Sequence, residues 1–261
     1  MADTDFPLPP WRRDVPRRAA AARPPLSREQ IIQAGLRIVI EEGIDSLSMR
    51  RIAAVFHTSA SSLYAHVANK EELLQLMFDH ICGAVEMPEP DPERWQEQIK
   101  ELARVGHTSM TEHNDIARAV LASIPSGPNA LRMSEGMLAI MLAGGVPPKF
   151  AAWSLDRLFL YIVSDAYETS LHMQQVGGRS QREYFDDFTV QLTDYYENLP
   201  ADRFPNIRKH ARILTSGDSA ERFEFGLDML IDGLAKYVER PFDQPVKNAK
   251  TRKSQANRSG G

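Results

Sequence analysis

Residues 47–70 read LSMRRIAAVFHTSASSLYAHVANK, and the rest of the chain is organised around this stretch. Ser48 can cap a helix whose apolar side chains face inward. A break at His57-Thr58 leads to a second helix of about eight residues that begins near Ser59. Two short helices joined by a tight turn are typical of a helix-turn-helix that reads DNA.

The second helix of this pair combines small and long polar side chains. Small residues at its start allow the helix N-terminus to approach base edges, and free N–H groups there favour phosphate. Tyr64, His66 and Lys70 are longer and can supply hydrogen bonds or charge to phosphates. Outside such a motif Tyr64 would more often be a packing residue, and His66 a half-exposed surface residue.

Helices are predicted on both sides of this pair. Ser27 and Gln30 form a capping box for a helix that Gly43 ends in a left-handed C-cap. Asn69 begins another helix, which runs to about Ala84. Prolines at 88, 90 and 92 then stop that helix and mark a domain boundary.

The run from Ser27 to Asp79 resembles the DNA-binding domain of the TetR family of bacterial transcriptional regulators. It carries that family's Leu-Ser-x-Arg-x-Ile-Ala pattern, followed by Ser-Leu-Tyr-x-His-Val-x-Asn-Lys-Glu-x-Leu. The resemblance implies that the helix beginning at Asn69 links the DNA-binding head to the body. It also implies a set of DNA-facing residues: Ser48, Arg50, Ser59, Ala60, Ser61, Ser62, Tyr64, Ala65, His66 and Lys70. Ala60 and Ala65 stand where relatives often carry larger side chains that contact bases, so these two positions are expected to give weak direct base readout.

Composition indicates a globular protein without a membrane span. Hydrophobic residues make up 43% of the chain and charged residues 25%. No apolar run approaches the roughly 20 residues that a transmembrane helix needs, so we expect a cytoplasmic protein. Cys82 is the sole cysteine, which excludes an internal disulfide and a cysteine-based zinc site. We expect its thiol to be buried on a helix rather than reactive.

Charge is distributed unevenly along the chain. The net charge is −4, yet residues 1–70 carry ten basic and seven acidic side chains, and residues 71–246 sum to −12. Such an asymmetry suits a module that approaches a polyanion with one face. Residues 1–26 are rich in proline and arginine and should form a disordered arm, which either contacts DNA or is only solvated. Residues 241–261 should form a flexible basic tail.

The sequence predicts an all-α fold with two domains. Residues 27–86 form the helix-turn-helix domain, built on three N-terminal helices, and residues 91–240 form a larger helical domain for ligand binding and dimerisation. No segment alternates with period two, so no sheet is expected. The segment Lys149 to Val176 is apolar around most of its circumference and must be buried from more than one side. Residues 199–219 are expected to be a loop.

Two groups of residues in the larger domain are candidates for binding. Methionines adapt to irregular ligands, aromatic rings offer flat apolar area, and an arginine could fix an acid or carbonyl, although ordinary core is the alternative. The pocket candidates are Met133, Met137, Met141, Trp153, Arg157 and Tyr161. Asp218 and Glu221 cap a last helix, in a segment that resembles the C-terminal domain of the tetracycline-repressor branch. That resemblance implies a dimer interface on its apolar stripe: Phe223, Leu227, Leu230, Ile231 and Leu234.

No catalytic or metal-ligating set stands out. His107 and His113 are too far apart around a helix to share a ligand, and phosphate-loop and nucleophile-elbow motifs are absent. A carboxylate site on the long helix, at Asp156, Asp165, Glu168 and His172, is a weaker alternative to an interface or a pocket wall. No enzyme activity, metal or resident cofactor is expected. Tetracycline binding is not predicted either, because no magnesium–drug ligand set can be matched residue by residue.

The sequence therefore predicts a ligand-responsive transcriptional regulator. We expect a repressor that binds a palindromic DNA operator as a homodimer and is released by a small-molecule effector. The alternative is a helical small-molecule-binding or enzymatic body whose helix-turn-helix serves protein contacts.

Overall fold

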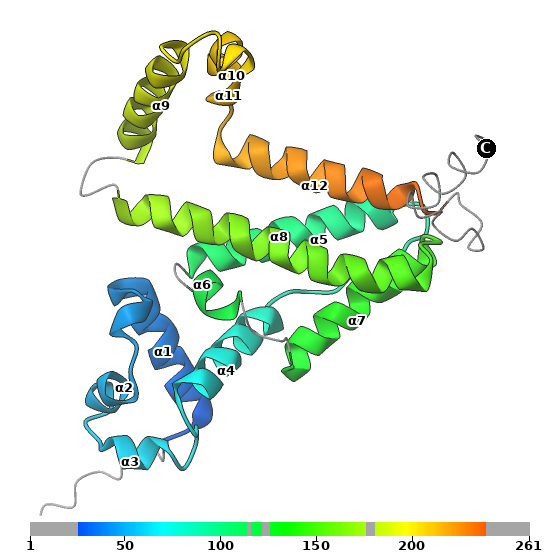
Figure 1. The fold of residues 1–261 in the computed structure, drawn as a ribbon. Helices are drawn as coiled ribbons and strands as arrows, with labels where there is room; N and C mark the ends of the chain where they lie inside the picture. The colour runs from blue at the N-terminus through cyan, green and yellow to red at the C-terminus, as the bar shows by residue number, and fades with distance from the viewer. Residues whose placement is uncertain (1–25, 114–115, 122–125, 176–180, 239–261) are drawn as a thin grey trace, which may run out of the picture.

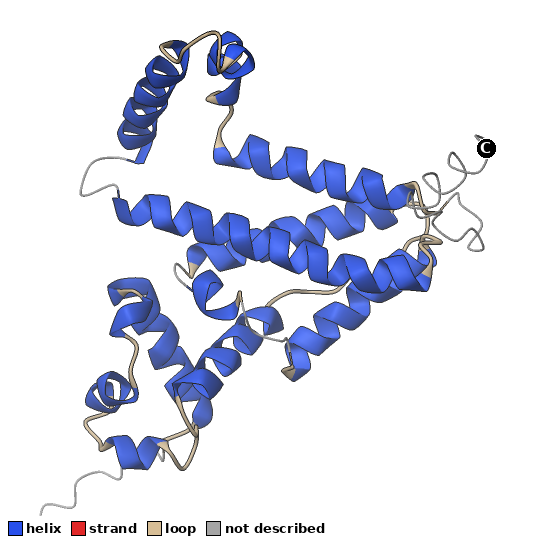
Figure 2. Cartoon of the chain, viewed as in Figure 1, coloured by secondary structure: helices blue, strands red, loops and turns tan. Residues whose placement is uncertain are grey.

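The computed structural model describes residues 26–113, 116–121, 126–175 and 181–238. Within these ranges the chain is helical and has no strand, which confirms the all-α prediction (Figure 2). None of the described helices is both long and apolar enough to cross a membrane. The predicted tail, and the predicted arm apart from Leu26, lie outside these ranges. The α-helices are α1 (Arg28–Glu42), α2 (Met49–Val55), α3 (Ala60–Leu63), α4 (Lys70–Gly83), α5 (Trp95–Glu112), α6 (Ile116–Val120), α7 (Pro128–Ala143), α8 (Pro148–Gln175), α9 (Gln181–Glu197), α10 (Pro205–Lys209), α11 (Ala211–Leu214) and α12 (Ser219–Ala235).

Helices α1 to α4 form the N-terminal head, and its helix starts match the predicted caps. The Ser27 hydroxyl accepts from the Gln30 amide at 3.2 Å, and the Gln30 side chain accepts from the Ser27 amide at 3.0 Å. Asn69 caps α4 by accepting from the Glu72 amide at 2.8 Å. At the other end of α1, Gly43 has a φ of 80° and a ψ of 163°. Its φ is positive as expected, but its ψ is extended rather than left-handed helical.

A sharp turn separates α2 from α3. His57 has a φ of 51° and is, among the described residues, the one non-glycine with a positive φ. The chain reverses there, and the Thr58 amide donates to the carbonyl of Ala53 at 3.0 Å. Helix α3 spans four residues, which is shorter than the predicted eight, because the chain continues from Tyr64 as a turn.

The body is built around α8, which lies along α5 and α12 (Figure 1). Leu158, Val163 and Ala166 of α8 are buried, whereas Trp153 and Leu171 are exposed, so the predicted burial holds for only part of this segment. The apolar core of the head continues into the body through Met110 of α5 and Ile116 of α6. Head and body therefore share apolar contacts around α4, although prolines separate their sequences.

Helices α9, α10 and α11 extend away from the head, beyond the ends of α8 and α12 (Figure 1). The prediction of a loop over residues 199–219 was wrong. Pro205 begins α10, since proline is favoured in the first turn of a helix, and α11 follows almost at once. The Thr193 and Thr215 hydroxyls lie 2.6 Å apart and join α9 to the end of α11.

Helix α12 begins with the predicted capping box and packs on α5 and α8. The Asp218 carboxylate accepts from the Glu221 amide at 2.8 Å. The apolar stripe of α12 lies inside the protomer, where Phe223, Leu227, Ile231 and Leu234 are buried in the body's core and Leu230 is half-buried. These five residues were the predicted dimer interface. Four of them are already covered by the chain's own helices and are not free for a partner, whereas Leu230 is half-buried.

Candidate functional site

The helix-turn-helix presents most of the predicted DNA-facing residues to solvent. Seven of the ten are exposed, and the other three are half-buried. The exposed residues are Ser48, Arg50, Ser59, Ser61, Ser62, Tyr64 and Ala65, and the half-buried ones are Ala60, His66 and Lys70. Leu63 and Val67, both buried, anchor the segment that carries them to the head's core.

Several of these side chains also have local structural partners. Ser48 caps α2 by accepting from the Arg51 amide at 3.1 Å, and Ser59 caps α3 by accepting from the Ser62 amide at 3.3 Å. The Lys70 ammonium lies 3.5 Å from the carbonyl of Ile44, so it leans toward the head. Tyr64, in contrast, has 53% of its surface exposed. Helix α3 has only four residues, so its dipole is weak and its N-terminus alone attracts phosphate less than a longer helix would.

An ion pair holds α2 against α1. The Arg51 Nε lies 3.1 Å from Oε2 of Glu42, and a second nitrogen of the same guanidinium contacts Oε1. These hydrogen bonds hold the pKa of Glu42 below its ordinary value. The pair fixes the orientation of α2, the helix that precedes residues 59–69, which we name the recognition segment after the predicted DNA-facing side chains that they carry. Arg51 therefore has a positioning role.

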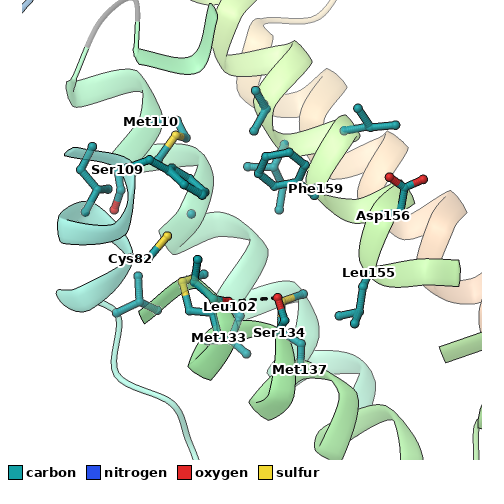
Figure 3. A pocket seen from close by; sticks show the side chains of 18 of the residues that line it. Cys82, Leu102, Ser109, Met110, Met133, Ser134, Met137, Leu155, Asp156 and Phe159 are labelled. Carbon is teal, nitrogen blue, oxygen red and sulfur yellow. Dashed lines mark hydrogen bonds between the residues drawn. The ribbon is translucent and has the colours of Figure 1, made fainter. Parts of the chain in front are cut away.

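The body contains an apolar cavity of about 450 Å³ bounded by α4, α5, α7 and α8 (Figure 3). Among the described residues that line it, the polar ones are Cys82, Ser109, Ser134 and Asp156. Asp156 forms an ion pair with the adjacent Arg157. A cavity of this size and character suits a largely apolar small molecule that makes a few hydrogen bonds.

The structure separates the six predicted pocket residues. Met133 and Met137 line the cavity (Figure 3), whereas Met141 is fully buried in the core beside it. The other three are not among the lining residues: Trp153 is 60% exposed beneath the Lys149 ammonium, Arg157 is exposed, and Tyr161 donates at 2.7 Å to the carbonyl of Phe223. Trp153, Arg157 and Tyr161 recur every four residues, so they share one face of α8. Another face of the same helix forms the cavity wall.

Helix α4, which was not among the predicted pocket elements, also lines the cavity. Phe78, Ile81 and Cys82 of this helix, with Val85 just beyond its end, form one wall. The broad apolar face of α4 was visible in the sequence, but the cavity beside it was not, since Phe78, Ile81 and Cys82 also belong to the head's core. Burial raises the pKa of the Cys82 thiol to about 12, with a further contribution from the Asp79 carboxylate. The thiol is therefore neutral at physiological pH.

A second cavity of about 500 Å³ lies between α1, α4 and α5. Its lining includes Arg37, Glu41, His80, Glu112 and His113, and it shares two wall residues with the apolar cavity. The shared residues are Ile81 and Ser109. This polar cavity leaves space between the head and the body.

The residues considered as a carboxylate site do not gather. Asp165 lies 2.7 Å from the His107 ring, Asp156 pairs with Arg157, and the side chain of His172 lies outside the described residues. In the described part of the chain, no three histidine, cysteine or acidic residues are grouped so that they could hold a metal ion. Of the groups on α8, Asp165 joins α8 to α5, whereas Asp156 pairs within α8.

Comparison with known proteins supports the same division into head and body. Residues 31–77 match the family model of bacterial regulatory proteins of the tetR family, and residues 87–238 match that of the tetracyclin repressor-like C-terminal domain. The structure superposes with a TM-score of 0.74 on the Streptomyces coelicolor TetR family protein ActR in complex with actinorhodin, at 40% identity over 81% of this chain and 96% of that one.

Two sequence relatives agree with these matches. The HTH-type transcriptional repressor DrrR1 of Streptomyces coeruleorubidus is 26% identical, covering 83% of this chain and 80% of the relative. The class G tetracycline repressor protein of Vibrio anguillarum is 29% identical, covering 81% and 94%. Together, the helix-turn-helix, the helical body and these matches show that the chain belongs to the TetR family of bacterial transcriptional regulators.

Proposed function

We propose that this protein is a repressor that binds operator DNA through α2 and α3 and is released by a small molecule bound in the apolar cavity. One observation carries the proposal: α4, which directly follows the DNA-facing segment, is also a wall of the cavity. A molecule that fits the cavity in only one orientation of α4 would shift the equilibrium between two positions of the head. The similarity to DrrR1, a transcriptional repressor, supports repression over activation.

The effector is proposed to be a largely apolar compound. The described lining is apolar with two serine hydroxyls and a neutral thiol, and the carboxylate within it, that of Asp156, is paired with Arg157. ActR binds actinorhodin in the solved complex, so actinorhodin is the first compound to test. The class G relative is a tetracycline repressor, which makes tetracycline the second.

The active form is proposed to be a homodimer. The buried stripe of α12 is not available to a partner, but Phe225 and Met229 on the opposite face are 67% and 61% exposed. Large apolar side chains exposed on one face of a helix indicate a protein contact. A two-fold dimer would place two recognition segments roughly 34–36 Å apart and so would bind a palindromic operator. Because its target is DNA, the protein would act in the cytoplasm.

The proposal is tested by selection from fragmented genomic DNA. Purified protein is expected to enrich palindromic fragments at moderate salt, and actinorhodin or tetracycline is expected to release them in a fluorescence anisotropy assay. If no fragment is enriched over a protein-free control, the protein does not act on DNA, and the helix-turn-helix would then serve protein contacts. If DNA binds and neither compound releases it, a wider panel of apolar compounds is required.

A further inference from the structure

A buried carboxylate of α4 caps the start of α7. Asp79 is 8% exposed, and its Oδ1 accepts from the main-chain amides of Asn129 and Ala130 at 2.9 and 3.0 Å. Its Oδ2 accepts from the side-chain amide of Asn129 at 3.1 Å. The first amides of a helix have no acceptor within that helix. A carboxylate from another helix accepts their hydrogen bonds, and its negative charge interacts favourably with the helix dipole.

The approach of Asp79 depends on the residue before α7. Gly127 is the N-cap of α7, and a Cβ built at that position would lie 2.1 Å from Oδ1 of Asp79. Any larger residue would displace the carboxylate. The two helices therefore meet in a close contact between a carboxylate and main chain, and this geometry tolerates little sliding.

A side chain of α7 caps the end of α4 in return. The Arg132 Nη2 lies 3.1 Å from the carbonyl of Cys82, 3.0 Å from that of Val85 and 3.5 Å from that of Gly83. The last carbonyls of a helix lack partners in the helix, and a guanidinium carries the charge that the C-terminal end favours. Asp79 of α4 thus caps the N-terminal end of α7, and Arg132 of α7 caps the C-terminal end of α4. We name these two sets of hydrogen bonds the α4–α7 link.

The link borders the cavity, and α4 connects it to the head. Phe78, Ile81 and Cys82, which flank Asp79 on α4, line the cavity, as do Ala130 and Met133, which flank Arg132 on α7. At its other end, α4 begins at Lys70, directly after the recognition segment. A helix of 14 residues is about 21 Å long and transmits a rotation at one end to the other.

We propose that Asp79 and Arg132 carry ligand-induced movement of α7 to the DNA-binding head. The proposal rests on the proposed function. Apolar side chains can slide past one another, but separating the first turn of α7 from α4 would leave a buried carboxylate and several amides without partners. The two helices therefore move as one unit. The alternative is that a ligand displaces α4 directly through Phe78 and Cys82, without the link.

The test compares operator affinity with and without saturating actinorhodin in the full-length chain. The first variants are Asp79→Asn, which removes the charge, and Arg132→Met, which keeps the aliphatic stem but removes the guanidinium. We expect actinorhodin to weaken operator binding of the unaltered protein by at least about tenfold, and of either variant by less than about threefold. The affinity of each variant for actinorhodin alone, measured by fluorescence quenching, should stay within threefold.

Two further variants serve as controls. Arg132→Lys keeps a positive charge that can reach the carbonyls, and it should restore most of the effect of actinorhodin. Arg118→Met breaks another contact between body and head, the exposed pair of Arg118 with Asp45 at 3.4 Å, and should leave the effect unchanged. A response to actinorhodin in Asp79→Asn and Arg132→Met equal to that of the unaltered protein would overturn the link as the route. Circular dichroism melts establish that each variant is folded.

A second measurement needs neither DNA nor ligand, and so separates this proposal from the proposed function. Ser134→Trp adds bulk to the α7 side of the cavity, and hydrogen exchange is read at the main-chain amides of residues 71–78. The substitution is expected to change exchange there several-fold when the link is intact and to leave it unchanged when combined with Asp79→Asn and Arg132→Met. If exchange changes equally in both backgrounds, the signal passes without the link. If it changes in neither, cavity and head are not coupled through α7. Failure of the unaltered protein to bind any DNA would refute the proposed function alone.

Discussion

Arg104 of α5 and Glu224 of α12 form a two-point ion pair, in which Nε and Nη2 of the guanidinium lie 2.8 and 2.9 Å from the two carboxylate oxygens. Arg104 also contacts Glu97 at 2.8 Å, and Lys100 contacts Asp228 at 2.6 Å, one turn earlier in α5 and one turn later in α12. Bidentate geometry is the strongest form of such a pair. These ion pairs hold α12 against α5 beside the buried Phe223 and Leu227. They therefore orient the helix that we propose to form the dimer interface.

Glu224→Gln should make stability less dependent on pH in the acid range. The hydrogen bonds from Arg104 hold the pKa of Glu224 below its ordinary 4.5. The unfolded chain therefore takes up a proton first as the pH falls, so the pair stabilises the fold above about pH 4.5 and loses this effect as the pH falls through the depressed pKa. Because the pair is about 40% exposed, the variant should lose only about 0.5–1 kcal/mol at pH 7.

Urea denaturation at pH 7 and at pH 3.5 checks this expectation. The difference between the variant and the unaltered protein should shrink at the lower pH. Glu101→Gln is the matched control, because Glu101 makes a single contact of 3.3 Å with Arg94 at a more exposed site. A difference that grows as the pH falls would contradict the assignment.

The Cys82 thiol should be nearly inert in the folded protein. It is 4% exposed, and burial raises its pKa to about 12, so the thiolate fraction at pH 8 is about a thousandfold lower than that of an ordinary thiol. Since it is the sole cysteine, iodoacetamide labelling followed by intact mass reports this site alone. We expect alkylation in hours for the folded chain and in minutes in urea. Equal rates in the two states would show that the cavity wall at α4 opens readily.

Local signals in the sequence predicted the helix starts well. Ser27 with Gln30 and Asp218 with Glu221 are capping boxes in the structure, because a cap depends on residues three apart in the chain. Pro205 was wrongly predicted to lie in a loop, because a proline also suits the first turn of a helix, where the structure places it. A proline alone does not distinguish a loop from the first turn of a helix.

The cavity could be predicted only in part, because a helix pattern shows that a face is covered but not by what. Met133 and Met137 do line the cavity, whereas Trp153 lies on another face of α8. In the same way, the apolar stripe of α12 predicted that another surface covers it, and the chain's own α5 and α8 are that surface. The role of Asp79 gave no sequence signal, since its partners lie 50 residues further along the chain.

Tyr64→Ala and Lys70→Ala should each weaken operator binding without affecting ligand binding. Tyr64 is exposed beside α3 and suits a phosphate hydrogen bond or base contact, and loss of a single such contact costs about tenfold in affinity. Loss of a phosphate-bound lysine should also lower the slope of log affinity against log salt by about one. Tyr64→Phe is the control that removes the hydroxyl alone. Anisotropy titrations at several salt concentrations measure both effects, and unchanged slopes for Lys70→Ala would indicate that Lys70 only supports the Ile44 carbonyl.

The exposed face of α12 should determine the oligomeric state. Phe225→Glu combined with Met229→Glu places two charges on the proposed dimer surface, and burial of unpaired charge is strongly unfavourable. We expect light scattering after size exclusion to report a dimer for the unaltered chain and a monomer for the variant, with weaker operator binding. Leu131→Glu, a change at a residue that is 54% exposed on α7, is the control and should remain dimeric. A dimer that survives the double substitution would place the interface elsewhere.

Gly106 offers a way to fill the cavity without disturbing its walls. A Cβ built there would meet Ile162 at 3.8 Å, an ordinary contact, and Gly106 lies in the interior of α5 on the cavity wall. Gly106→Ala should therefore stabilise the fold by roughly 0.5–1 kcal/mol, since glycine is a poor helix former, while leaving most of the cavity open.

Gly106→Leu projects three further carbons into the cavity and should weaken binding of a cavity-sized ligand by about tenfold or more, with operator affinity retained. Calorimetric melts and actinorhodin quenching of the two variants separate backbone stabilisation from occlusion. If the Gly106→Leu and Gly106→Ala variants bind actinorhodin equally well, the ligand does not use this cavity. The polar cavity between α1, α4 and α5 then becomes the site to examine.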